Sequence, residues 1–139
     1  MRQAQEEITV TTSGQGLYEI SDVVRAFTEA CGMETGQLTA YCRHTSASLV
    51  IQENADPDVQ RDLLAFFRRL VPDGDPLFVH TMEGPDDMPA HVKSALTQTS
   101  ITIPIVRRLL ALGTWQGLYL FEHRRNPHLR KIVLHALGS

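Results

Sequence analysis

The spacing of apolar residues differs from one segment of the chain to the next. The order of these segments constrains the fold more than any other feature of the sequence. Segments whose apolar residues alternate, as in strands, outnumber those with helical spacing. The predicted strands cover residues 7–12, 38–51, 77–82, 99–105, 109–112, 115–123 and 130–137, and the predicted helices begin near residues 21, 56 and 86. Helices do not regularly separate these strands, as a parallel βαβ fold requires. The order therefore predicts an α+β fold with a mixed, mostly antiparallel sheet and helices packed on one face.

Proline, glycine and aspartate mark where the predicted helices begin and end. Asp56 followed by Pro57 combines a capping side chain with a proline in the first turn. The Pro-Asp-Gly-Asp-Pro run at 72–76 ends that helix, and Gly32 ends the first one. No linker divides the chain, so its 139 residues are predicted to form a single domain, 1–139.

The charge balance and the two cysteines limit the partners and the compartment. With 13 basic and 16 acidic residues, the net charge of -3 gives no general attraction for phosphate backbones and disfavours nucleic-acid binding. No apolar stretch approaches the roughly 18 residues that cross a bilayer. The first residues lack the apolar run of a signal peptide. Cys31 and Cys42 fit no C-x-x-C pattern and indicate a reducing compartment. We expect a cytoplasmic protein without nucleic-acid or membrane partners.

Four of the six histidines lie beside other polar residues where predicted strands or helices begin or end. They are His44, His80, His91 and His123. Neutral imidazole is a good zinc ligand, and an open catalytic site needs three protein ligands and one free position. The chain contains no H-E-x-x-H motif and no compact Cys/His cluster. For each histidine taken alone, the spacing therefore favours a surface or hydrogen-bonded role over metal ligation.

The acidic pair Asp86-Asp87 has two interpretations. Asp87 can simply cap the helix that follows, which accounts for an acid before Met88-Pro89 without any function. Alternatively, one carboxylate caps the helix while its neighbour acts as a general base or a metal partner. The spacing alone favours the capping role.

Four runs of residues together resemble the YjbQ-like family, whose members are described as secondary thiamine-phosphate synthase enzymes. The runs are His44-Thr-Ser-Ala-Ser-Leu49, Glu53-Asn-Ala-Asp-Pro57, Asp86-Asp-Met-Pro-Ala-His91-Val-Lys93, and Gly113-Thr-Trp-Gln-Gly117 continuing to Glu122-His-Arg124. One departure is the hairpin at 106–108, Val-Arg-Arg, where family members usually have a glycine. A non-glycine residue must then adopt an unusual backbone geometry there, or the turn must differ.

The resemblance also implies a fold, an assembly and a site. It implies a mixed, strongly curved sheet packed on helices and a homotrimer. The polar site that it implies draws on His44, Asp87, His91 and His123, with Glu53, Asn54, His80, Asp86, Lys93 and Arg124 nearby. Our own assignment of roles makes His44, His91 and His123 the ligands of a divalent metal ion, zinc or a substitute, and gives catalytic roles to Asp87, Lys93, Arg124, Glu53 and Asn54. Asp87 would act as a base or orient a histidine, while Lys93 and Arg124 would neutralise phosphate charge.

Two functions therefore remain open. The first is a metal-dependent enzyme acting on a small phosphorylated substrate. Its side activity would join hydroxymethylpyrimidine diphosphate to thiazole phosphate, giving thiamine phosphate. The second is a non-catalytic, trimeric module that binds a metal or a metabolite through the same residues. Turnover by the metal-loaded protein distinguishes the two.

Overall fold

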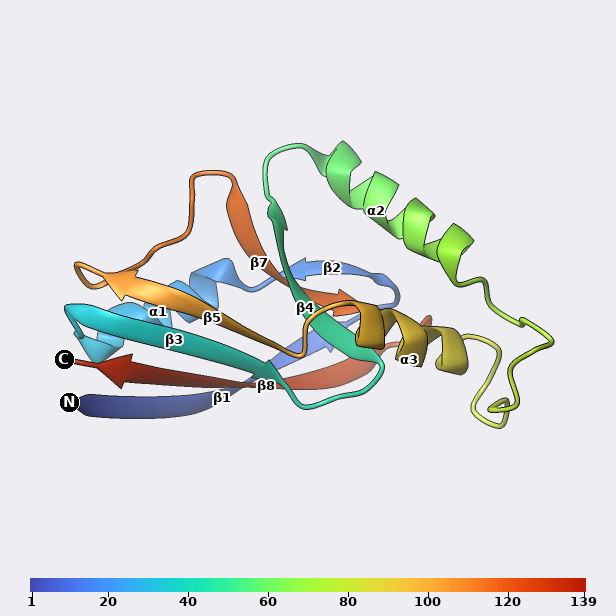
Figure 1. Ribbon diagram of the computed structural model, residues 1–139, viewed down its shortest axis with the longest axis horizontal. Helices are drawn as coiled ribbons and strands as arrows, with labels where there is room; N and C mark the ends of the chain where they lie inside the picture. The colour runs from blue at the N-terminus through green and yellow to red at the C-terminus, as the bar shows by residue number, and fades with distance from the viewer.

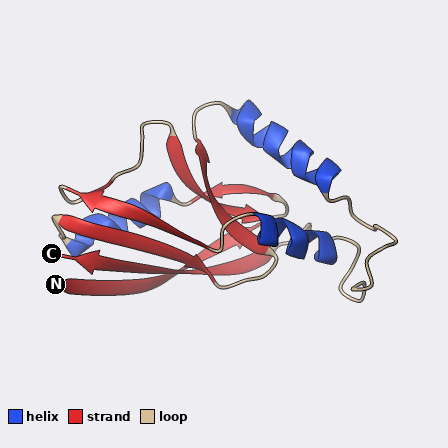
Figure 2. Cartoon of the chain, viewed as in Figure 1, coloured by secondary structure: helices blue, strands red, loops and turns tan.

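The computed structural model describes residues 1–139 and consists of two antiparallel sheets and three helices (Figures 1 and 2). The elements are β1 (Arg2–Thr12), β2 (Gly16–Glu19), α1 (Ser21–Cys31), β3 (Thr35–Cys42), β4 (Ala47–Glu53), α2 (Pro57–Leu70), α3 (Asp87–Leu96), β5 (Ser100–Val106), β6 (Leu109–Leu110), β7 (Gln116–Glu122) and β8 (His128–Gly138). One sheet has the strand order β1-β8-β3-β5-β6 and the other β2-β7-β4. Every strand pairing is antiparallel. The predicted α+β class with a curved, mostly antiparallel sheet is confirmed.

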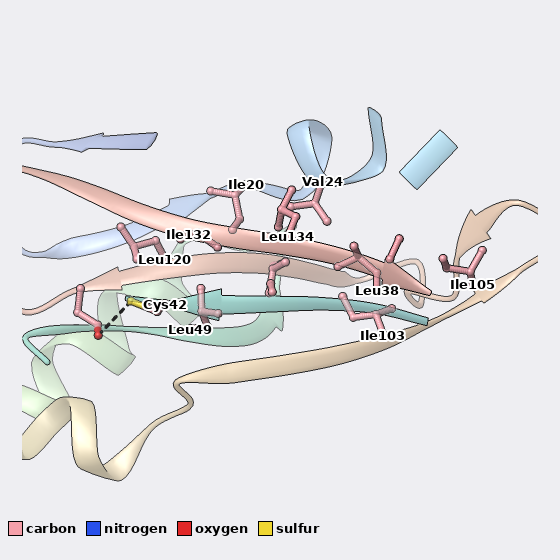
Figure 3. Close-up of a cluster of buried hydrophobic side chains, with 14 of the residues drawn as sticks. Ile20, Val24, Leu38, Cys42, Leu49, Ile103, Ile105, Leu120, Ile132 and Leu134 are labelled. Carbon is pink, nitrogen blue, oxygen red and sulfur yellow. Dashed lines mark hydrogen bonds between the residues drawn. The ribbon is translucent and has the colours of Figure 1, made fainter. Parts of the chain in front are cut away.

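Strand β8 lies between β1 and β3 in the larger sheet and shows how alternation builds the core. Its residues Ile132, Leu134 and Ala136 are fully buried, and the side chains between them are half-buried. They pack in one cluster with residues of both sheets and of α1, such as Val24 and Leu120 (Figure 3). Burial of this apolar face is the main stabilising contribution that positions the strands.

The predicted single strand 38–51 is wrong, because the chain forms two strands that belong to different sheets. Cys42 pairs with Ile132 in the larger sheet, whereas Ala47 pairs with Glu122 in the smaller one. The ladder ends at His44, whose Nε2 accepts the hydrogen bond from the Lys131 backbone N–H at 2.7 Å. A side chain thus replaces the backbone carbonyl that a continuous strand would supply.

The predicted strand 77–82 is also wrong. The segment forms turns and irregular structure, and the side chains of Leu77, Val79 and Met82 are almost fully exposed. Asp75 begins a local turn by accepting the Leu77 N–H. No neighbouring strand lies beside the segment to complete a ladder, so the alternation of apolar residues has no sheet to join.

Two local predictions about the backbone are confirmed. The Asp56 side chain accepts the Asp58 N–H at the start of α2, with Pro57 in the first helical position. In the hairpin between β5 and β6, Arg107 and Arg108 both adopt positive φ, at 50° and 72°. Two consecutive left-handed residues are the geometry of a type I′ turn, so non-glycine residues take the unusual conformation there.

Helix α2 follows the loop after β4 and extends away from that strand, beyond the sheets (Figure 1). None of its residues is fully buried, and Phe66 and Leu70 are half-exposed. Neither α2 nor any other helix has the length and apolar character that crossing a membrane requires.

Candidate functional site

The two aspartates at the start of α3 bind an arginine rather than cap the helix. Asp86 occupies the N-cap position, but its side chain forms no capping hydrogen bond. Its Oδ2 accepts hydrogen bonds from Arg124 Nε and from the Arg125 backbone N–H, both at 3.0 Å. Asp87 Oδ1 lies 2.8 Å from Arg124 Nη1. The capping interpretation of Asp87 is therefore wrong, and both carboxylates belong to a polar cluster.

Two histidines converge on the second oxygen of Asp87. His80 Nε2 lies 2.6 Å from Asp87 Oδ2, and His91 Nε2 lies 3.2 Å from the same atom. Asp87 and His91 are four residues apart on α3, which places them on one face of the helix. The three ligand atoms all lie within 4.8 Å of one another. The cluster offers two imidazole nitrogens and one carboxylate oxygen, a donor set that zinc and similar ions accept.

The hydrogen bond of the other His91 nitrogen fixes the protonation of its ring. His91 Nδ1 lies 2.9 Å from the Thr45 carbonyl oxygen, which can only accept, so Nδ1 carries a hydrogen. In the neutral ring, Nε2 then presents a lone pair toward the carboxylate of Asp87. Two acceptors 3.2 Å apart repel each other unless a proton or a metal cation lies between them. The position therefore requires a positive species.

The charges around Asp87 keep it ionised. Burial acts to raise the pKa of Asp87, but the hydrogen bond from His80 and the positive charge of Arg124 outweigh burial, so the pKa lies below its usual value. Each of the three Arg124 nitrogens has a partner, because Nη2 donates to the Glu83 carbonyl at 3.0 Å. Arg124 thus orients the carboxylate, and its side chain, only 12% exposed, has little access to the phosphate that it was predicted to neutralise.

The spacing of the cluster fits a metal ion after one small movement. Zinc–nitrogen bonds of about 2.0 Å in tetrahedral geometry place ligand atoms about 3.3 Å apart. The 3.2 Å between His91 Nε2 and Asp87 Oδ2 already matches this spacing. His80, at 2.6 Å, must withdraw by about 0.7 Å to reach the same separation. Its side chain is 43% exposed and belongs to the irregular segment before α3, so it has room to move. The movement changes its edge-on contact with the His91 ring, whose centroid lies 5.5 Å away.

The three predicted metal ligands do not come together within one chain, which corrects the predicted set. His44, His91 and His123 form no group of neighbouring ligand atoms; His80 and Asp87 accompany His91 instead. The Nε2 lone pair of His44 is used by the Lys131 N–H, so its Nδ1 carries the hydrogen. Burial, followed by the charge of Arg130, lowers the pKa of His44. Neither nitrogen of neutral His44 therefore offers a free lone pair.

His44 nevertheless lies next to the cluster. It lines a hollow of about 520 Å³ together with His91, Arg43, Thr45 and Ser94, among other residues. The Ser94 hydroxyl is buried and has no hydrogen-bond partner. A polar hollow beside the candidate metal ligands is the place where a substrate would bind.

His123 and Lys93 belong to a different part of the interior. His123 is 1% exposed, its Nε2 lies 2.9 Å from Ser48 Oγ, and burial lowers its pKa to about 3. Lys93 is 3% exposed and, two residues after His91, lies on another face of α3. His123 and Lys93 line the same small void, away from the hollow that holds His91. The predicted roles of both side chains in the histidine site are not supported.

Glu53 and Asn54 also lie outside the cluster. Glu53 is the last residue of β4 and Asn54 follows it, while the Thr45 carbonyl that binds His91 precedes the beginning of this strand. Six residue steps of strand separate Ala47 from Glu53, a distance of about 20 Å. Glu53 Oε2 accepts the Asp56 N–H and so supports the start of α2. Within one chain, Glu53 and Asn54 therefore do not reach the histidine cluster.

The comparisons with known proteins agree with this fold. The family model described as UPF0047 protein YjbQ-like matches residues 6–139. A UPF0047 protein of Synechocystis sp. is 51% identical over 138 residues, covering 99% of this chain and 94% of that protein. The UPF0047 protein YjbQ of Escherichia coli O157:H7 is 37% identical, covering 97% of this chain and 98% of that protein.

Solved structures give the same result. An uncharacterised conserved protein of the YjbQ/UPF0047 family from Clostridium acetobutylicum is 35% identical, with a TM-score of 0.85 over 95% of this chain and 99% of that chain. A hypothetical protein from Aeropyrum pernix K1 is 28% identical, with a TM-score of 0.89 over 98% of this chain and 99% of that chain. The names of these relatives state no activity.

Proposed function

This chain belongs to the UPF0047 YjbQ-like family, and we propose that it is a metal-dependent enzyme that acts on a small phosphorylated substrate. The contact between His91 Nε2 and Asp87 Oδ2 carries the proposal, because in the neutral ring the Thr45 carbonyl leaves the Nε2 lone pair facing a carboxylate. A divalent ion held by His80, Asp87 and His91 would remove this repulsion. When bound, the ion would act as a Lewis acid on a phosphoryl or leaving oxygen.

The chain's own side chains have distinct roles in this proposal. Arg124 holds Asp87 in place and keeps its carboxylate charged. Thr45 fixes the His91 tautomer through its carbonyl. Arg43 and His44 line the adjoining hollow, where Arg43 would bind the phosphate and neutral His44 would donate a hydrogen bond. A hollow of about 520 Å³ is the right size for a small metabolite.

The reaction that we propose as a side activity joins a pyrimidine to a thiazole. The thiazole nitrogen forms a bond to the exocyclic carbon of hydroxymethylpyrimidine diphosphate, the carbon–oxygen bond breaks, and diphosphate leaves with the electron pair. A cation near the hollow favours this departure because charge develops on the leaving oxygen. The alternative is a metal- or metabolite-binding protein without turnover, which the same donor set also supports.

We further propose that the functional unit is a homotrimer. The apolar side of α2 supports a contact with a second copy, since Phe66 and Leu70 remain half-exposed on it. Beside them, a hollow of about 470 Å³ is lined mainly by apolar residues of α2, β4 and β7, including Leu63, Phe67 and Phe121. A neighbouring subunit would bury this surface.

Metal content and turnover test the proposal together. The wild-type protein, loaded with zinc and passed through a desalting column, should retain about one ion per chain. His80→Gln and His91→Gln should lose it, whereas His128→Gln, a change at a histidine outside the cluster, should not. Diphosphate release from the pyrimidine diphosphate and thiazole phosphate should require the retained ion. Retention by both cluster variants would refute the metal site; retention without any turnover would favour the binding protein.

A further inference from the structure

A second polar region lies beside the turn between β1 and β2 and is lined by two arginines. A hollow of about 380 Å³ is formed by Ser13, Gly14, Gln15, Arg68 and Arg125, with no apolar residue among them. A second hollow of about 220 Å³ adjoins it and shares Arg68 and Arg125. Arg68 also lines a third, much smaller void of about 10 Å³. Arg68 is thus the side chain common to all three spaces.

Both guanidinium groups keep most of their hydrogen-bond donors free. Arg68 uses only Nε, which donates to Gln15 Oε1 at 3.4 Å. Arg125 pairs through Nη2 with Asp73 Oδ2 at 2.5 Å. Each guanidinium has five N–H groups, so several donors of each side chain remain available toward the hollow.

The inner end of this region contains a buried imidazole nitrogen without a partner, beside a buried lysine that forms no ion pair. His123 Nδ1 is buried and forms no hydrogen bond. Lys93 lines the same 10 Å³ void as His123, and the carboxylates near it, Asp73 and Asp86, are paired with arginines instead. Buried groups of this kind normally have a partner, so the void points to a ligand or a water that supplies one.

A chain of hydroxyl groups determines which form of His123 faces the void. Thr97 Oγ1 donates to the Lys93 carbonyl at 2.8 Å and lies 2.5 Å from Ser48 Oγ. Ser48 then donates its hydrogen to Thr97 and accepts from His123 Nε2. The remaining nitrogen, Nδ1, is an acceptor. The void has space for about one water molecule, which could donate to Nδ1 and bridge to a ligand further out.

From these contacts we infer that the hollow between Arg68 and Arg125 binds a phosphate group, with Lys93 and a water on His123 Nδ1 at its inner end. Three cations, Arg68, Arg125 and Lys93, line these spaces together with two carboxylates, Asp73 and Glu122. Glu122 is already paired with Arg130, so the remaining local charge favours an anion. Guanidinium groups match the oxygens of phosphate in two-point hydrogen bonds. The site shares no side chain with the His80–Asp87–His91 cluster.

Titration calorimetry with inorganic phosphate at low ionic strength tests this inference. The wild-type protein should bind phosphate, and Arg68→Gln should weaken binding about ten-fold or more through loss of charge-assisted hydrogen bonds. Arg69→Gln is the matched control: it removes the same charge from the next residue of α2, which lines none of the three spaces, and should change affinity less than two-fold by the screening of an exposed charge.

Three further measurements complete the test. Glycerol 2-phosphate is titrated in parallel to distinguish a phosphate ester from free phosphate. It should bind as well as free phosphate if the hollow accepts organic molecules. The nitrogen NMR signal of His123 Nδ1 should shift on binding. Zinc retention by Arg68→Gln should equal that of the wild type, which separates this site from the metal cluster. Absence of binding up to about 10 mM phosphate, or equal losses in Arg68→Gln and Arg69→Gln, would overturn the inference.

Discussion

Glu122 and Arg130 form a two-point ion pair in the interior of the protein, with Arg130 Nε 2.7 Å from Glu122 Oε1 and Nη2 2.5 Å from Oε2. Both side chains are almost completely buried. Glu122 Oε2 also accepts the backbone N–H groups of His123 and Arg124. The carboxylate therefore sets the path of the chain into Arg124, the residue that holds Asp87.

Removing the charge of Glu122 should destabilise the protein strongly. Glu122→Gln leaves the Arg130 guanidinium buried without its counter-ion, and the free energy of unfolding should fall by about 3–5 kcal/mol. Glu7→Gln is the control, because Glu7 pairs with Arg43 at the surface and its loss should cost about 1 kcal/mol or less. Urea denaturation at pH 7 measures both changes. Similar losses in the two variants would contradict a structural role for the buried pair.

Stability should depend on pH through His123. Its pKa falls from 6.5 to about 3 on folding, because burial disfavours the charged ring. Above pH 6.5 the ring is neutral in both states. As the pH falls below 6.5, only the unfolded chain gains the proton, so stability should drop by about 1.4 kcal/mol per pH unit until pH 3.

The His123→Gln variant isolates this contribution. Between pH 7 and pH 5 the wild type should lose about 2 kcal/mol more stability than His123→Gln does. Urea denaturation at the two pH values gives the difference, and His128→Gln controls for the loss of a histidine outside the core. Equal pH dependence in the wild type and His123→Gln would mean that the ring can take up a proton in the folded state.

The β5–β6 hairpin should be improved by residues that favour positive φ. Arg107 and Arg108 both lie in the left-handed region, which costs about 1–2 kcal/mol for an ordinary residue. Arg107→Asn with Arg108→Gly introduces the Asn-Gly pair typical of type I′ turns. Although the exposed contact of Arg108 with Glu34 is lost, thermal unfolding should show a net gain of about 1 kcal/mol. A lower melting temperature would indicate a different turn.

The proposed trimer should depend on the apolar side of α2. Light scattering should give a mass three times the chain mass of 15.6 kDa for the wild type. Phe66→Glu places a charge on the half-exposed surface and should give monomers, because burying an unpaired carboxylate is unfavourable. Val79→Glu alters an apolar side chain that is 96% exposed outside the hollow and should leave the trimer intact. A wild-type monomer would refute the assembly.

Regular elements were predictable from the sequence because their signals are local. Asp56-Pro57 sets the start of α2, and the alternation of residues 99–105 predicts β5. The break after Cys42 was not predictable, since apolar alternation continues on both sides of it. What ends the strand is the contact between His44 and the Lys131 N–H, which joins residues 87 positions apart.

In the candidate site, too, local signals were predictable and contacts between distant residues were not. Asp87 and His91 were predicted together, and their four-residue spacing on α3 carries that signal. His80 was placed only nearby, because the irregular segment that positions it has no periodicity. His123 was assigned as a ligand although it is buried in another part of the interior. Sequence motifs showed which residues are polar and close to element ends, and the tertiary contacts decide which of them meet.

Anomalous scattering from zinc-soaked crystals tests the central claim most directly. The metal site proposed here predicts one peak at the zinc edge, about 2.0–2.2 Å from His80 Nε2, His91 Nε2 and Asp87 Oδ2, with His80 moved outward from its present contact. A peak at His44 or His123, or none at the Asp87 cluster, would contradict it.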